Sequence, residues 1–350
     1  MSQLRHVHLN TATAVASTVV SAAAPSMRAI VQRGYGAPDV LTFEEVERPV
    51  PGDDEVLVRV HSAAVSIGDH HVVSGRPFVV RLSPQAGMLK PRSRIPGQAL
   101  SGRVEAVGAK VSTLAVGDEV FGDTPAGAFA EFAVVPARRL APKPVNLSFE
   151  EAAATSWAVT PLQGLRDVGG LRPGQRVLIN GASGGVGSWA IQIAKALGAH
   201  VTAVCSGRNA ELVRSLGADA VIDYTKEDFV SGGARFDLVF DTVGNRALSD
   251  FRKVLTPTGA YVACAGGDSS LRWLFRMAQA SLMSLFTRQK LKIFVVSPNQ
   301  ADLLSLKELV EADKAKPFIE RRYPLSQVAE ALRHLGGRHT RGQVVIRNAA

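Results

Sequence analysis

A glycine-rich run at residues 181–187, with the sequence GASGGVG, is the first candidate for a functional site in this chain. A short apolar segment, 177–179, precedes the run, and apolar residues at helical spacing follow it through 189–197. A strand, a glycine turn and a helix in this order let the backbone approach a pyrophosphate closely, and the first N–H groups of the helix stabilise its charge. The usual fingerprint has one more glycine, so an ordinary turn is the alternative. We expect dinucleotide contacts from Ala182, Ser183, Gly184, Gly185, Val186 and Gly187.

The end of the next apolar segment, 200–204, decides which dinucleotide fits. A site for NAD has an acidic residue there, whereas a site for NADP offers small polar groups and an arginine to the extra phosphate. This chain has Ser206, Arg208 and Asn209. We therefore predict NADPH, and the alternative is that Arg208 is simply solvated at the start of a helix. Further cofactor contacts are predicted after the later strands, at Tyr224, Val243, Gly244, Ala265 and Gly266.

The composition is typical of a soluble globular protein, with 46% apolar and 20% charged residues in 350, enough for two domains. A formal net charge of +9 suits a nucleic-acid partner, but the basic residues are scattered and only 6% of the residues are aromatic. We therefore expect no nucleic acid, and an anionic cofactor instead. The two cysteines, Cys205 and Cys264, are too few for a disulfide framework or a four-thiolate zinc site, which favours a reducing, cytoplasmic compartment.

The chain divides into four segments. Residues 1–26 predict a flexible tail, with a secretory signal and an organellar transit peptide as alternatives. Residues 27–150 carry short alternating strands between turn residues, which is typical of a partly closed β domain, with a longer loop at its centre. Residues 151–296 begin inside a helix that has a capping box at Ser148 and Glu151, and they then alternate strands and helices as in a doubly wound parallel sheet. Residues 297–350 end in a helix and a strand, and no apolar run in the chain is long enough to span a membrane.

This order of segments, together with the motifs GASGGVG, LGAD, VIDY and GQVVI, resembles the medium-chain dehydrogenase/reductase superfamily. Within it, the chain is similar to the zinc-independent quinone-oxidoreductase branch. The resemblance extends from Met27 to Arg347. It implies a GroES-like first domain to which residues 297–350 return, an NADPH-binding Rossmann domain, and a homodimer.

The resemblance also identifies the positions at which zinc-dependent relatives bind their catalytic metal. Those relatives use two cysteines and a histidine, and the matching positions here are Ser66, Ser156 and Gln98. Hydroxyl and amide groups do not replace thiolate and imidazole on Zn²⁺. His70 and His71 cannot chelate one ion together, because adjacent side chains point in different directions. We therefore expect no metal.

The family has the stretch around Asp69 beside the nicotinamide. The simplest interpretation is that Asp69 caps a short helix, while one of His70 and His71 is packed and the other is exposed. A role for one histidine toward the substrate is the alternative.

Without zinc to polarise a carbonyl, hydride delivery to a conjugated enone or a quinone is favoured, because the charge spreads onto an oxygen that hydrogen bonds can stabilise. The resemblance implies an NADPH-dependent reductase with a small lipophilic enone or quinone in the cleft between the domains. Branch members share an Asn and a Tyr near the first helix, whereas this chain has Ser66 and no Tyr, so water or the cofactor ribose is an alternative proton donor. A zinc-free carbonyl reductase or alcohol dehydrogenase and a non-catalytic NADPH-binding protein are the rival functions. The candidate catalytic residues are Ser66, Asp69, His70, Gln98, Ser156 and Thr160.

An apolar segment at 269–296 carries one helical stripe. Such a stripe is interpreted as core or as a homodimer seam, or as a roof over the substrate pocket. Contact with a membrane surface is a third interpretation, which we do not expect. The stripe consists of Leu271, Leu274, Phe275, Ala278, Leu282 and Leu285, broadened by Trp273, Met277 and Leu291.

Overall fold

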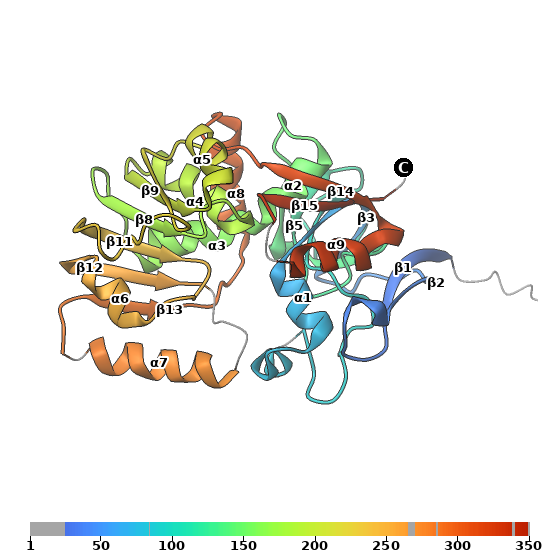
Figure 1. The fold of residues 1–350 in the computed structure, drawn as a ribbon. Coiled ribbons are helices and arrows are strands. Elements are labelled where there is room, and N and C mark those ends of the chain that lie inside the picture. The colour runs from blue at the N-terminus through green and yellow to red at the C-terminus, as the bar shows by residue number, and fades with distance from the viewer. Residues whose placement is uncertain (1–24, 84, 265–269, 285, 338–339, 349–350) are drawn as a thin grey trace, which may run out of the picture.

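The computed structural model describes residues 25–83, 85–264, 270–284, 286–337 and 340–348. They form two lobes, each built around its own sheet (Figure 1). The predicted tail lies outside the described residues except for its last two, and Ser26 already begins a strand. In the described part of the chain, no helix is both long and apolar enough to cross a membrane.

The first lobe holds the partly closed β domain that the sequence predicts. Its sheet has the strand order β14-β15-β3-β4-β5-β7, with β6 paired to β3, and a separate hairpin joins β1 to β2. Its strands are β1 (Ser26–Gln32), β2 (Leu41–Glu47), β3 (Glu55–Val65), β4 (Ala99–Val107), β5 (Glu119–Asp123), β6 (Phe132–Pro136), β7 (Leu140–Pro142), β14 (Ile319–Pro324) and β15 (Gln343–Arg347). Its α-helices are α1 (Ile67–Ser74), α2 (Phe149–Thr155) and α9 (Val328–Gly336).

Short helical turns complete this lobe. The predicted loop at 76–94 contains one of them, η2 (Phe78–Leu82). The others are η1 (Pro38–Val40), η3 (Ala137–Arg139), η4 (Ser156–Ala158) and η7 (Leu325–Gln327). The predicted capping box is confirmed at α2, where the Ser148 hydroxyl accepts from the N–H of Glu151 and the Glu151 side chain accepts from the N–H of Ser148.

The second lobe is a doubly wound parallel sheet, as the sequence predicts. Its strand order is β10-β9-β8-β11-β12-β13, and every pairing in it is parallel. The order reverses between β8 and β11, where ligands bind beyond the carboxyl ends of the strands of such sheets. Its strands are β8 (Arg176–Asn180), β9 (His200–Cys205), β10 (Ala220–Asp223), β11 (Phe236–Asp241), β12 (Leu255–Ala263) and β13 (Lys290–Ile293). Its helices and turns are α3 (Val159–Leu162), the π-helical turn η5 (Gln163–Val168), α4 (Gly185–Ala196), η6 (Gly207–Asn209), α5 (Ala210–Ser215), α6 (Leu248–Lys253), α7 (Ser270–Ser284) and α8 (Gln300–Glu311).

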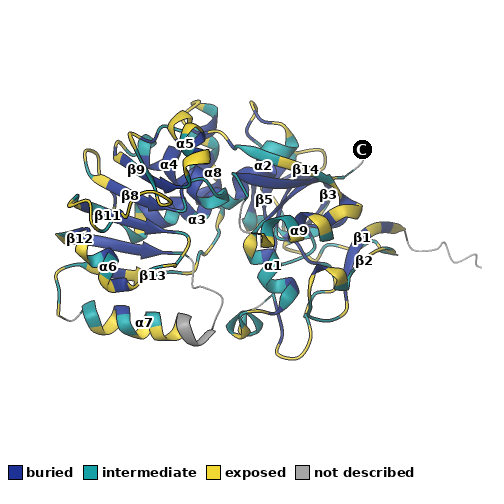
Figure 2. Ribbon diagram, viewed as in Figure 1, coloured by how far each residue is buried: buried dark blue, intermediate teal, exposed yellow. Residues whose placement is uncertain are grey.

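Buried side chains fill both lobes (Figure 2), and the cluster around the second sheet also includes Phe121 and Ala141 of the first lobe. In the second lobe, Trp189 of α4 and Phe240 of β11 are among the largest fully buried side chains, and they belong to the cluster that α8 joins through Leu303 and Leu306. The segment 297–350 therefore contributes to both lobes. Its first helix packs on the Rossmann core, whereas β14 and β15 join the sheet of the first lobe.

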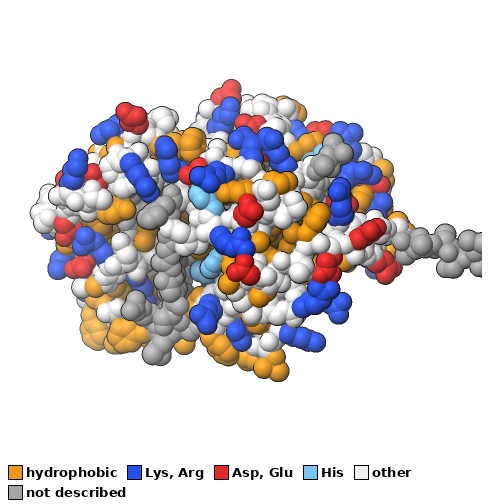
Figure 3. All heavy atoms as spheres, turned by 45° about the vertical axis from the view of Figure 1, so that its right-hand side comes forward, with side chains coloured by type: hydrophobic (Ala, Val, Ile, Leu, Met, Phe, Trp, Pro, Cys, Tyr) orange, Lys and Arg blue, Asp and Glu red, His pale blue; other side chains and the backbone are white. Residues whose placement is uncertain are grey.

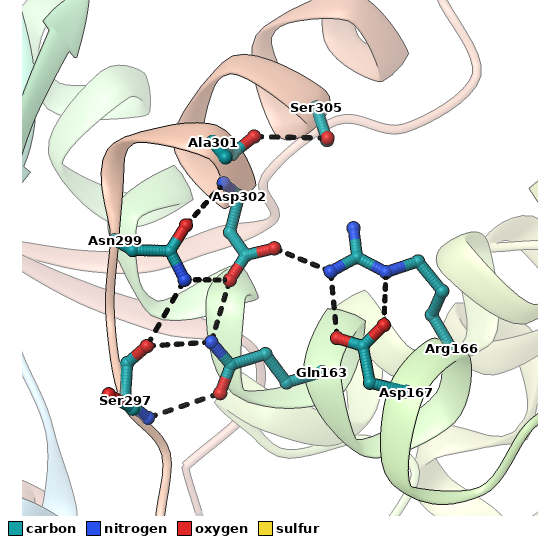
Figure 4. A network of polar contacts seen from close by, with 8 residues as sticks. All are labelled: Gln163, Arg166, Asp167, Ser297, Asn299, Ala301, Asp302 and Ser305. Carbon is teal, nitrogen blue, oxygen red and sulfur yellow. Dashed lines mark hydrogen bonds and ion pairs between the residues drawn. The ribbon is translucent and has the colours of Figure 1, made fainter.

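A polar network fixes the start of α8 against the helices that precede β8 (Figure 4). The buried Asp302 carboxylate accepts from Gln163 Nε2 at 2.6 Å, from Arg166 Nη2 at 2.6 Å and from Asn299 Nδ2 at 2.7 Å. Arg166 also forms a bidentate pair with Asp167. Because three donors satisfy one buried carboxylate, the chain leaves the Rossmann sheet in a defined direction.

Candidate functional site

The glycine turn after β8 has a backbone that only glycine suits at two positions. Gly181 has a φ of 81°, in the left-handed region. A Cβ on Gly187 would lie 2.2 Å from the carbonyl oxygen of Gly181 and 2.7 Å from the Cα of Ala182. Helix α4 can therefore pack directly against the turn only because position 187 has no side chain.

The N-terminus of α4 has the features of a pyrophosphate cradle. Within the described residues, no side chain caps the helix at Gly184, so its first-turn N–H groups remain open to a ligand. A Cβ on Gly184 would meet nothing closer than 3.6 Å, which leaves room for a ligand to approach the backbone. Uncapped donors, the positive end of the dipole and open space suit a bound anion. The residues present therefore fit a dinucleotide.

The C-terminal part of the chain holds this turn from the other lobe. The N–H of Gly342 donates to the carbonyl of Ser183 at 2.9 Å, and Gln343 Nε2 donates to the carbonyl of Gly185 at 3.0 Å. Both contacts use carbonyl oxygens of the turn and none of its N–H groups, of which those of Ala182 and Gly184 already donate to the carbonyls of Val204 and Gly181. Sequence reasoning missed Gly342 and Gln343, because no local pattern indicates that the last strand meets the glycine turn.

The end of β9 gathers the polar residues that the sequence predicts there. Asn209 is buried, and its Nδ2 donates to Ser183 Oγ at 2.9 Å and to Ser206 Oγ at 3.3 Å. This side chain therefore ties the end of β9 to the glycine turn. Arg208 is exposed on η6, and its guanidinium has no partner among the described residues. It is free to bind an anion.

An acidic residue that we did not predict lies close to this position. Asp223 ends β10 directly opposite Cys205, and a Cβ on Gly207 would come within 2.4 Å of its Oδ2. Hydrogen bonds from Thr225, whose hydroxyl is 2.7 Å away, hold the pKa of Asp223 below its ordinary value. The next residue, Tyr224, donates its N–H to the carbonyl of Cys205 and is exposed beside the end of β9. Lys226 lies 3.9 Å from Asp223, so a second cation accompanies this acid.

The loop after β11 is shaped by Asp241, which sequence reasoning also missed. Asp241 is fully buried, and its Oδ1 accepts from the N–H groups of Val243 and Gly244 at 3.1 and 3.0 Å. Asn180, at the end of β8, donates to the same oxygen at 2.9 Å. One carboxylate thus joins the carboxyl ends of β8 and β11 where the strand order reverses. The other two predicted contacts of this region, Ala265 and Gly266, lie outside the described residues.

The three positions that match zinc ligands of relatives lie near one end of β3 and β4. Ala64 and Ala99 are directly paired across these strands. Gln98 immediately precedes Ala99, and Ser66 follows Ala64 by two residues. Trp157 Nε1 donates to the carbonyl of Ala64 at 3.3 Å, which brings the turn that starts at Ser156 to the same place. The fold therefore brings together Ser66, Gln98 and Ser156 from three separate segments.

This donor set does not fit zinc. It offers two hydroxyls and an amide, whereas Zn²⁺ in proteins takes sulfur, imidazole nitrogen and carboxylate oxygen. Among the described residues, no group of three or more His, Cys, Asp or Glu is arranged to hold a metal ion. Ser156 is buried, and its hydroxyl lies 3.5 Å from the carbonyl of Ala152, a long hydrogen bond. Thr160 is half-buried one turn later, in α3.

Ser66 and Asp69 form a capping box at the start of α1, in which Ser66 is the N-cap and Asp69, the expected cap, lies inside the helix at its third position. The Ser66 hydroxyl and N–H both donate to Asp69 Oδ2 at 2.8 Å, and the N–H of Asp69 donates to Ser66 Oγ at 3.2 Å. Asp69 Oδ1 finds no hydrogen-bond partner among the described residues, although the side chain is 1% exposed. Burial raises the pKa of the Asp69 carboxyl to about 7, and the bonds from Ser66 only partly oppose this.

The two histidines of α1 differ from the expected arrangement. Both His70 and His71 are half-buried, rather than one packed and the other exposed, and their ring centroids are 6.2 Å apart. Both line a cavity of about 670 Å³ beside α1. Its remaining wall has no acidic residue and consists of Tyr35, Gly36, Ala37, Pro38, Ile67, Ser74, Arg76, Pro77, Arg81 and Gly336.

Comparisons with known proteins find relatives that match nearly the whole chain. Residues 52–145 match the family described as alcohol dehydrogenase GroES-like domain, and residues 216–346 match the family described as zinc-binding dehydrogenase. The chain is 35% identical to a 2-methylene-furan-3-one reductase of Solanum lycopersicum, over 95% of this chain and 82% of that protein. It is 33% identical to an NADPH-dependent alkenal/one oxidoreductase of Arabidopsis thaliana, over 96% and 83%. The solved quinone oxidoreductase of Coxiella burnetii superposes with a TM-score of 0.79 at 28% identity, covering 92% of this chain and 99% of that one.

Proposed function

The chain belongs to the medium-chain dehydrogenase/reductase superfamily, in its quinone-oxidoreductase-like branch, and we propose that it is a zinc-free, NADPH-dependent reductase of α,β-unsaturated carbonyls or quinones. One observation carries the proposal. The protein combines two features. The N-terminus of α4 is uncapped and lies beside glycines, and hydroxyl and amide groups occupy the positions where zinc-dependent relatives have metal ligands.

The preference for NADPH is supported by the cations near the end of β9. Arg208 is exposed and unengaged within the described residues, and Lys226 lies beyond the end of the neighbouring strand. A guanidinium binds a phosphate through paired, charge-assisted hydrogen bonds. Asp223 opposes this effect, but its carboxylate is already held by Thr225 and by the N–H of Gly207. A ribose phosphate would therefore meet Arg208 first.

The choice of an activated alkene or a quinone is supported by the donors around Ser66. Reduced nicotinamide, when bound, supplies the hydride. The chain itself must orient the substrate and stabilise the negative charge that develops on its oxygen. Neutral hydroxyl and amide donors suffice when that charge is delocalised, whereas a simple ketone needs a stronger acid or a metal.

We assign the proton supply to the pair Ser66 and Asp69. With Asp69 ionised, the Ser66 hydroxyl donates to its Oδ2 and has no proton left for a substrate. With Asp69 protonated, the carboxyl can donate to Ser66 Oγ, which frees the serine O–H to donate elsewhere. A pKa of about 7 makes both forms available near neutral pH.

The experiment that tests this function is cofactor oxidation with matched substrates, each assayed with NADPH and with NADH. The panel contains an enone, the saturated ketone of the same skeleton, and a small quinone. We expect turnover of the enone or the quinone with NADPH and none of the ketone. Equal turnover of the ketone would favour a carbonyl reductase, and cofactor binding without any turnover would favour a non-catalytic NADPH-binding protein.

A further inference from the structure

Helix α7 packs with its most apolar face outward. Leu274, Phe275 and Leu282 are 54%, 68% and 60% exposed, and they lie on the stripe that the sequence predicts. Ala278 on the same face is exposed too, and so is Phe286 just beyond the helix, at 83%. These five residues, which we call the outer face of α7, are not core. A surface helix of a globular protein normally turns such a stripe inward.

Polar contacts anchor the opposite side of α7. Arg276 reaches the buried Asp241 carboxylate at 3.1 Å and the carbonyl of Gly244 at 3.0 Å, and it also contacts the Tyr261 hydroxyl. Ala280, one turn further, is 3% exposed. A buried ion pair of this kind strongly disfavours rotation of the helix, because Asp241 would lose its cationic partner. The contacts of Arg276 on the inner side therefore keep the outer face of α7 exposed to solvent.

The charged residues in the sequence stretch that contains this helix all have the same sign. No Asp or Glu occurs between Ser269 and Ala301 in the sequence. The same stretch contains Arg272, Arg276, Arg288, Lys290 and Lys292. Arg288, Lys290 and Lys292 are exposed, and they follow directly after Phe286. Figure 3 shows hydrophobic side chains gathered at its lower left, at the level of α7.

A basic depression adjoins the C-terminal end of α7. It measures about 430 Å³ and is lined by Ser249, Arg252, Lys253, Pro257, Thr287 and Gln289. Gln289 accepts from Arg252 Nε at 3.0 Å and so fixes the guanidinium, which has no carboxylate partner in the described part of the chain. Lys253 pairs with Asp250 at 3.1 Å. A fixed guanidinium with two hydroxyls suits one phosphate group.

From these observations we infer that α7 docks this protein onto the surface of a bilayer containing anionic phospholipids. The outer face enters the interface between headgroups and acyl chains, Arg288 and Lys290 approach the anionic surface, and the basic depression receives a lipid phosphate. An apolar helix face flanked by cations and free of acids is the pattern of helices that lie in a membrane interface. The inference is independent of the proposed reductase function.

A second copy of the chain is a poorer occupant of the same face. A two-fold interface brings identical patches together, so the patch with Arg288, Lys290 and Arg252 would face the same basic patch of the partner. The neighbouring edge strand β13 also carries Lys290 and Lys292, and lysines on an edge strand oppose pairing with another edge.

Flotation of the full chain with vesicles tests the inference. We expect the protein to float with vesicles of phosphatidylcholine and phosphatidylglycerol, and much less with phosphatidylcholine alone. Raised salt should weaken flotation with the anionic vesicles only. Phe275→Asp/Leu282→Asp should weaken flotation at least tenfold. Arg252→Gln should weaken it about fivefold, and only on the anionic vesicles. The matched control is Val50→Asp/Val116→Asp, which adds the same two charges at exposed valines of the other lobe.

Two results would overturn the inference. One is equal flotation of the Phe275→Asp/Leu282→Asp variant and its control. The other is a lipid-free dimer, seen by light scattering, that the same double substitution dissociates, because the outer face would then bind a second copy. Circular dichroism and NADPH binding should match the unmodified protein in every variant, so that loss of flotation is not loss of folding.

Discussion

The N–H of Gly342 donates to the carbonyl of Ser183 at 2.9 Å, and this bond joins the last strand of the first lobe to the glycine turn of the second. Gly342 has a φ of 63°, and a Cβ there would lie 2.3 Å from the carbonyl oxygen of Phe318. The cradle for the cofactor is therefore supported by a residue that cannot carry a side chain without moving its neighbours.

We predict that Gly342→Ala weakens both folding and cofactor binding. The free energy of unfolding should fall by about 2 to 4 kcal/mol, because backbone strain adds to the clash with Phe318. Gly170→Ala is the matched control, since Gly170 has a φ of 62° but open space around it. The control should lose only about 1 kcal/mol and keep its NADPH affinity. Denaturant titration and NADPH titration measure the two effects, and equal NADPH affinities of the two variants would contradict the supporting role of Gly342.

Arg208→Ala should raise the KM for NADPH far more than the KM for NADH. Loss of one charge-assisted bond to a phosphate costs about 1.5 to 3 kcal/mol. Arg235→Ala is the control, because Arg235 is an exposed arginine of the same lobe that binds only carbonyls of its own loop. Initial rates at varied concentrations of NADPH and of NADH give the two KM values for each variant. Equal effects of Arg208→Ala on the two cofactors would show that this arginine does not select NADPH.

Asp69 should make the protein less stable as the pH rises from about 4 to 7. The pKa of its carboxyl is raised by burial to about 7, so the folded state binds its proton more tightly than the unfolded state does. The free energy of unfolding then falls through this window, by on the order of 4 kcal/mol, and levels off above it. Asp69→Asn should lack this fall. Parallel pH slopes of the two proteins, measured by denaturant titration, would rule the effect out.

Asp69 should also control the rate at high pH. Only the protonated carboxyl can donate to Ser66, so kcat for the preferred substrate should fall as the pH rises through about 7. Asp69→Asn keeps a donor at that position and should give a flatter profile, whereas Ser66→Ala should lower kcat at every pH. If the profile of the Asn variant follows that of the unmodified enzyme, the proton comes from another source.

Exhaustive chelation should leave turnover unchanged, and elemental analysis should find no stoichiometric zinc. The reason is the chemistry of Ser66, Gln98 and Ser156, which are poor ligands for Zn²⁺. Activity that is lost on chelation and restored by zinc would show that the metal binds at residues other than these.

Much of the fold follows from local patterns. The run from Gly181 to Gly187 between an apolar strand and an amphipathic helix predicts the cradle, because the turn and the helix start are decided by neighbouring residues. The Ser148 capping box is local in the same way. Strand β2 is harder to predict, since none of its seven residues is buried and its sequence shows no core-facing alternation.

The amino-acid sequence shows which groups are present: a glycine turn, an arginine after the second strand, and hydroxyls in place of zinc ligands. How those groups behave depends on contacts that form only in the folded protein. The pKa of Asp69 depends on its exclusion from water, and the approach of Asp223 to Gly207 depends on strand pairing. Periodicity also shows that Leu274, Phe275 and Leu282 share a helix face, but not which way the face turns. The buried bond between Arg276 and Asp241 decides that, because it joins residues that are distant in sequence, and a periodic pattern carries no information about such contacts.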